Sequence, residues 1–86
     1  MNAIRDLRKY LSKNATSDSA KVLAKLAVAL ANERDFALTD LYGLPFEEFE
    51  LAIEVMRDWR LDRYYASRMQ LLDVVLNEVL PEELRR

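Results

Sequence analysis

The sequence predicts an all-α fold: a single small domain of four to five helices, with orthogonal or bundle-like packing, over residues 1–86. Helix-forming residues dominate the chain, with fifteen leucines and ten alanines beside many Glu, Lys and Arg residues. One Gly and two Pro provide few turns, and a hydrophobic fraction of 51% is too high for a disordered chain. A length of 86 residues corresponds to one domain with a modest core.

The first two helices are predicted at about residues 3–12 and 19–32, separated by the polar segment NATSDS. In both helices apolar residues recur three and four positions apart, which is typical of one buried face. These residues are Ile4, Leu7 and Leu11 in the first helix, and Leu23, Leu26 and Leu30 in the second. Asp18 or Ser19 is expected to cap the second helix, because a short polar side chain there can accept a bond from a free backbone N–H.

A short helical turn is predicted at residues 39–42, followed by a helix at 45–59. Gly43 is expected to end the turn in the left-handed conformation that favours glycine. Pro45 suits the first turn of the next helix, where its missing N–H costs nothing. The apolar stripe expected for that helix consists of Phe46, Phe49, Ile53 and Met56.

The last helix is predicted at 62–80, and its apolar stripe is not in phase with the stripe of the helix before it. The stripe consists of Leu61, Tyr65, Met69, Leu72, Leu76 and Val79. At about 100° per residue the two stripes differ by roughly 140–150°. We therefore expect a break or sharp kink at 59–62, with one long helix from 45 to 80 as the alternative. Trp59 and Tyr65 are expected to anchor this joint in the core.

The predicted helix at 62–80 also has the widest apolar arc in the chain, which Leu71, Val74 and Val75 extend. A helix that is apolar over so much of its circumference is either central in the fold or shared with a second subunit. A homodimer through this helix is therefore one expected arrangement. Pro81 should end the helix, and residues 81–86 are expected to form a frayed tail.

The chain lacks residues on which several classes of protein chemistry usually depend. It contains no Cys and no His, which removes disulfides, the commonest general base and the commonest metal ligand. Glu47, Glu50 and Glu54 share one helical face, but without His we interpret them as a solvated acidic face. We expect no enzymatic activity, no cofactor, no metal and no small-molecule substrate.

No apolar run is long enough to span a bilayer and the start of the chain lacks a signal peptide, so we expect a cytoplasmic protein without membrane contact.

Charge is sorted along the chain although the net charge is only −2. Residues 1–34 carry a net +4, residues 35–54 a net −6 with no basic residue, and residues 55–72 a net +2. Two interpretations remain open. The basic and acidic parts either neutralise each other within the fold, or form a dipolar surface that orients a partner.

The segment RDWRLDRYYASR at 57–68 combines four arginines with three aromatic residues. The residues predicted to bind a partner here are Arg57, Arg60, Arg63, Tyr64 and Arg68. Arginines beside aromatic rings suit an acidic peptide or a nucleic acid, and they equally suit a solvated corner whose arginine stems cover the rings. The predicted function is that of a small non-enzymatic interaction or adaptor protein with a protein partner. The alternative is a nucleic-acid-binding regulator that uses the corner at 57–68.

Overall fold

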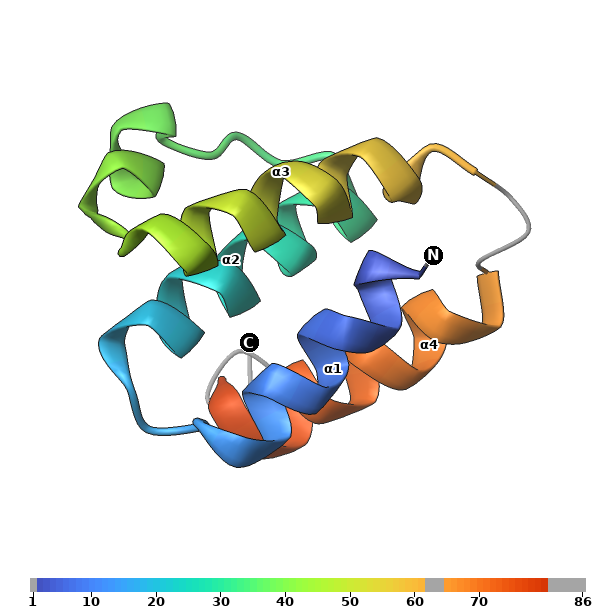
Figure 1. Ribbon diagram of the computed structural model, residues 1–86. Coiled ribbons are helices and arrows are strands. Elements are labelled where there is room, and N and C mark those ends of the chain that lie inside the picture. Colours follow the sequence, from blue (N-terminus) through green and yellow to red (C-terminus); the bar gives the residue numbers. More distant parts are fainter. Residues whose placement is uncertain (1, 62–64, 81–86) are drawn as a thin grey trace.

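The computed structural model describes residues 2–61 and 65–80 (Figure 1). Its elements are α1 (Ala3–Lys13), α2 (Asp18–Asn32), the 3-10 helix η1 (Leu38–Gly43), α3 (Phe46–Trp59), α4 (Tyr65–Val74) and the π-helical turn η3 (Val75–Val79). No strand occurs within the described ranges, which confirms the predicted all-α class. The expected tail at 81–86 lies outside the described residues.

The helices form two pairs that pack face to face (Figure 1). α1 lies beside α4, and α2 lies beside α3, while α1 also contacts α3 and α2 contacts η3. The segment 33–45 returns to the starting end of α2, so α2 and α3 run in the same direction. The fold measures 29 × 29 × 26 Å, and within its described residues no helix is long and apolar enough to cross a membrane.

Side-chain caps begin the first two helices. The Asn2 side chain accepts a hydrogen bond from the Arg5 backbone N–H at 3.1 Å, and Ser17 Oγ accepts one from Ala20 N–H at 3.0 Å. The expectation that Asp18 or Ser19 caps α2 is therefore wrong by one or two positions. Ser17 holds the extended conformation of a cap, whereas Asp18 lies in the first turn, where a carboxylate complements the helix dipole.

Within residues 2–61 and 65–80, the left-handed conformation occurs at Glu33 and not at Gly43. Glu33 ends α2 with φ 53° and ψ 43°, and its backbone N–H donates to the Ala29 carbonyl. Gly43 was expected to be left-handed, but its φ is not positive. The chain continues from η1 through Leu44 in an extended conformation into Pro45, so no reversal is required at Gly43.

The predicted break after Trp59 is confirmed, and a single long helix is excluded. α3 ends at Trp59, Arg60 is its C-terminal cap, and α4 begins at Tyr65. The Leu61 N–H turns back to the Asp58 carbonyl at 3.0 Å, which is the tightened bond of a helix end. The expected start of the last helix at residue 62 lies outside the described residues.

The core register of the last helix differs in part from the predicted stripe: Val79 is buried and Leu76 is partly buried against the core as predicted, but other members are not. Leu71, Val75 and Val79 are buried, whereas Tyr65 is 65% exposed and Met69 is 47% exposed. A π-helical turn advances less per residue than an α turn, which brings Val79 back toward the face of Leu71. Tyr65 is thus an exposed residue and not the core anchor expected of it.

The stripe predicted for α3 is confirmed for Phe49 and Met56, which are partly buried against the core, but it does not contain the residues that are fully buried. Its fully buried residues are the small Ala52 and Val55, which allow close packing on α1 and α2. Phe46, which was expected in the core, is 77% exposed. The stripe of α1 is confirmed, because Ile4, Leu7 and Leu11 are fully buried.

Candidate interaction surface

Asp58 and Ser67 hold the start of α1 in place. Asp58 Oδ2 accepts a hydrogen bond from the Ala3 backbone N–H at 2.9 Å. Asn2 Nδ2 donates to Ser67 Oγ at 2.7 Å. The end of α3 and the start of α4 therefore meet at the first turn of α1, where backbone N–H groups have no partner within the helix. Part of the predicted corner is thus structural.

Arg68 is also a structural residue in large part. Its guanidinium lies over the Trp59 ring, 5.0 Å from the ring centroid, and its Nη2 donates to the Leu61 carbonyl at 3.5 Å. Its Nε is buried and has no hydrogen-bond partner within residues 2–61 and 65–80. These contacts connect the first turn of α4 to the end of α3, and Trp59 packs against the core as expected.

Of the predicted binding residues, the structure describes Arg57, Arg60 and Arg68. Arg57 is exposed in the last turn of α3, Arg60 is exposed as its C-terminal cap, and Arg68 is half-buried beside Trp59. Arg63 and Tyr64 lie outside the described residues, so their part in the corner stays a prediction.

A groove of about 390 Å³ lies beside this corner, between α2 and α4. Its lining includes Leu30, Trp59, Tyr65, Arg68, Met69 and Leu72. Tyr65 and Met69 project their apolar surface at its edge. Sequence reasoning did not select them as surface residues, because a large apolar residue at helical spacing is a core signal first. We call Tyr65, Arg68 and Met69 the joint surface.

A second apolar surface lies at the opposite end of α3. Leu38, Tyr42 and Phe46 are all strongly exposed there. Tyr42 stacks on Phe49, with ring centroids 6.0 Å apart and planes inclined by 20°. An apolar hollow of about 250 Å³ is lined by Leu41, Tyr42, Leu44, Phe46 and Phe49, and the surrounding segment carries only acidic charge. The sequence pattern does not reveal this patch, because it predicts Phe46 in the core and Tyr42 in a turn.

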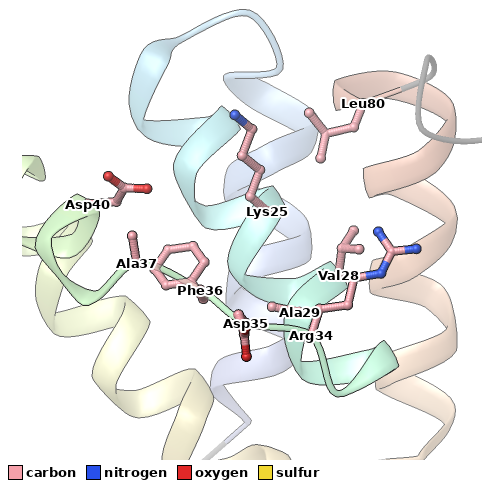
Figure 2. A pocket seen from close by; sticks show the side chains of 9 residues that line it. All are labelled: Lys25, Val28, Ala29, Arg34, Asp35, Phe36, Ala37, Asp40 and Leu80. Carbon is pink, nitrogen blue, oxygen red and sulfur yellow. The ribbon is translucent and has the colours of Figure 1, made fainter.

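A third hollow of about 250 Å³ lies between α2, the segment 33–37 and Leu80 (Figure 2). Phe36 contributes its ring, and the charged groups around the hollow are Lys25, Arg34, Asp35 and Asp40. Two cations and two carboxylates balance each other around an open, shallow depression. This arrangement does not select a ligand of either charge.

The remaining polar chemistry is sparse. Within the described part of the chain no group of three or more His, Cys, Asp or Glu residues could hold a metal ion. Tyr10 Oη donates to Glu48 Oε2 at 3.1 Å, connecting α1 to α3. Partial burial, followed by the hydrogen bond and the charge of Glu48, raises the pKa of Tyr10 above 10.0. Of the predicted acidic face, Glu47 and Glu50 are exposed and Glu54 is half-buried.

Comparisons with protein-family models, with curated proteins and with solved structures found no match to this chain. The joint surface and the exposed patch at the start of α3 are therefore the features on which a functional proposal depends.

Proposed function

We propose that this chain is a small non-enzymatic interaction protein whose joint surface binds a protein partner. The observation that carries the proposal is the exposure of Tyr65 and Met69 beside the groove, on a joint braced by Asp58, Ser67 and Arg68. Aromatic and Met side chains at a concave site are typical anchors of protein interfaces. Arg68 in the groove lining suits a partner segment that combines apolar residues with carboxylates.

The protein partner is favoured over a nucleic acid for two reasons. Arg68 occupies a face of the Trp59 ring on which a base would otherwise stack. Carboxylates on the same helix as Arg57 and Arg60 would repel a phosphate backbone, which supplies much of nucleic-acid affinity. The lack of cysteine fits the reducing cytoplasm, which we propose as the compartment.

The homodimer predicted through residues 62–80 remains a proposal of the same kind. Within residues 65–80, Tyr65 and Met69 are the large hydrophobic side chains that are exposed. A second copy that docks on the last helix would therefore cover the same joint surface as a different protein partner.

A comparison of variants in an affinity capture from native extract tests the proposal. The double variant Tyr65→Ser/Met69→Ser removes the apolar anchors, and Gln70→Ser, also exposed on α4, is the matched control. We expect one protein to be retained by the wild type and by Gln70→Ser, and to be lost with the double variant. Equal retention by all three proteins contradicts a role of the joint surface.

Titration with DNA and RNA at about 50 and 200 mM salt distinguishes a nucleic-acid-binding regulator from a protein-binding one. We expect no binding at the lower concentration. Binding that weakens steeply with salt and is lost in Arg57→Ala/Arg60→Ala would favour the nucleic-acid-binding regulator, because released counterions give phosphate contacts their salt dependence.

A further inference from the structure

The outward side of α3 carries a regular stripe. Its members are Phe46, Glu50, Ile53, Arg57 and Arg60, which are spaced four, three, four and three positions apart. This spacing places all five side chains within about 80° of the helix circumference. Phe46, Glu50, Arg57 and Arg60 are exposed and Ile53 is half-buried, whereas Ala52 and Val55 face the core. We call these five residues the α3 stripe.

Charge along the α3 stripe reverses around its centre. Glu50 lies in the first half, Arg57 in the second, and the apolar Ile53 between them. Both charged residues lie three and a half positions from the midpoint between Ile53 and Glu54, which is about 5 Å along the axis. A two-fold axis that lies in the interface between the copies, perpendicular to the helix and level with that midpoint, therefore places Glu50 of one copy opposite Arg57 of the other. Two-fold symmetry makes this contact twice.

We propose that a second copy of this chain docks antiparallel on the α3 stripe, with Ile53 at the centre and two Glu50–Arg57 pairs around it. This inference rests on the proposed interaction function and deepens it by naming a second copy as one partner. The two residues are seven positions apart in one helix, too far to pair with each other within the chain. The two-fold arrangement places them opposite each other between copies.

The exposed aromatic residues at the start of α3 fit the same arrangement. Phe49, which stacks on Tyr42, lies about 60° from Phe46 around the helix, on the same side as Arg60. The two-fold rotation keeps each residue on the same side of the interface and reverses its position along the helix axis. The aromatic residues of one copy therefore meet Arg60 of the other. A guanidinium over an aromatic ring is a favourable contact, and the dimer would cover rings that the monomer leaves in water.

The outer side of the last helix lacks such complementarity. The exposed charged residues of α4 and η3 are Asp73 and Glu78, which are both acidic. Arg68 contacts the Trp59 ring of its own chain. Two copies paired through this helix would place no opposite charges together within residues 65–80. The α3 stripe is therefore the stronger candidate for self-association. One helix pair with an aromatic flank is a small interface, so we expect a dissociation constant of about 1–100 μM.

Charge exchange between Glu50 and Arg57 tests the proposal by sedimentation equilibrium over about 5–500 μM protein. Glu50→Arg alone and Arg57→Glu alone each place like charges together twice, so each should weaken self-association about tenfold or more. An equimolar mixture of these two variants restores both opposite-charge pairs and should dimerise like the wild type. The double variant Glu50→Arg/Arg57→Glu should also dimerise. Both positions are exposed, and circular dichroism verifies that each variant is folded.

A wild-type chain that stays monomeric at about 500 μM overturns the proposal. Failure of the mixture to restore the dimer equally overturns it, because the two charges would then not face each other. The variant Tyr65→Ser/Met69→Ser separates the two proposals: it should dimerise as the wild type does while losing the captured partner. Loss of the dimer in this variant places self-association on the joint surface and contradicts the α3 stripe.

Discussion

The carboxylate of Asp58, in the last turn of α3, accepts a hydrogen bond from the backbone N–H of Ala3 at 2.9 Å, across 55 positions of the sequence. Ala3 is the first residue of α1, and its N–H has no acceptor within that helix. The negative charge also lies at the positive end of the α1 dipole. Asp58 therefore satisfies a helix end that its own segment cannot complete.

Replacement of Asp58 by Ala is expected to destabilise the fold by about 1–2 kcal/mol, because it removes both the acceptor and the favourable charge. For a domain of this size, each kcal/mol lowers Tm by about 4–8 °C. Thermal unfolding followed by circular dichroism measures the change. Asp73→Ala, at an exposed position of α4, is the control and should shift Tm little. Equal shifts for the two variants would show that the Asp58 contact does not stabilise the fold.

The core register of the last helix leads to a second prediction. Leu71 is fully buried, so Leu71→Ala should cost about 2–5 kcal/mol through lost burial and the cavity that remains. Met69→Ala, two positions earlier and half-exposed, should cost less than about 1 kcal/mol. Urea unfolding of both variants measures the difference. A larger cost at Met69 would restore the register expected from the sequence pattern.

The difference between α1 and α4 shows which parts of the fold the sequence can predict. Charged residues separate Ile4, Leu7 and Leu11, so only one face of α1 can be buried, and the prediction is confirmed. In the last helix, Leu71, Leu72, Val74, Val75 and Leu76 are nearly consecutive, so periodicity alone cannot select the buried face. Packing against α1 and α2 makes that choice, and it also determines that Tyr65 and Met69 remain exposed.

The candidate site also has features that the sequence can predict and features that it cannot. Exposure of Arg57 and Arg60 follows from their charge, because unpaired arginines are rarely buried. The structural roles of Asp58 and Ser67 depend on contacts 55 and 65 positions away, which no local pattern reveals. The stacking of Arg68 on Trp59 requires the break between α3 and α4, and only the existence of that break could be predicted.

Glycine offers a third prediction, since the residue in the left-handed region is Glu33 and not Gly43. A side chain at φ 53° is strained, so Glu33→Gly should stabilise the fold by about 1 kcal/mol. Glu33→Ala keeps a Cβ and is the control that should show no such gain. Gly43→Ala should be tolerated, because a Cβ there meets no atom within 4 Å and φ is not positive. Thermal unfolding of the three variants checks these signs, and destabilisation by Glu33→Gly would contradict the assignment.

Tyr10 gives a prediction about pH. Burial, with the hydrogen bond to Glu48, raises the pKa of Tyr10 in the folded state above 10.0, so folding favours the protonated phenol. The stability that comes from this shift is fully present below the unfolded-state pKa of about 10 and is lost as pH rises through the folded-state pKa. Tyr10→Phe should cost about 0.5–1.5 kcal/mol at pH near 8 by loss of the bond to Glu48, and the cost should shrink above pH of about 10. Urea unfolding at the two pH values measures this, with Tyr65→Phe, at an exposed ring, as the control. A cost for Tyr10→Phe that grows with pH would mean that the fold favours the phenolate, contrary to the position of Tyr10 beside a carboxylate.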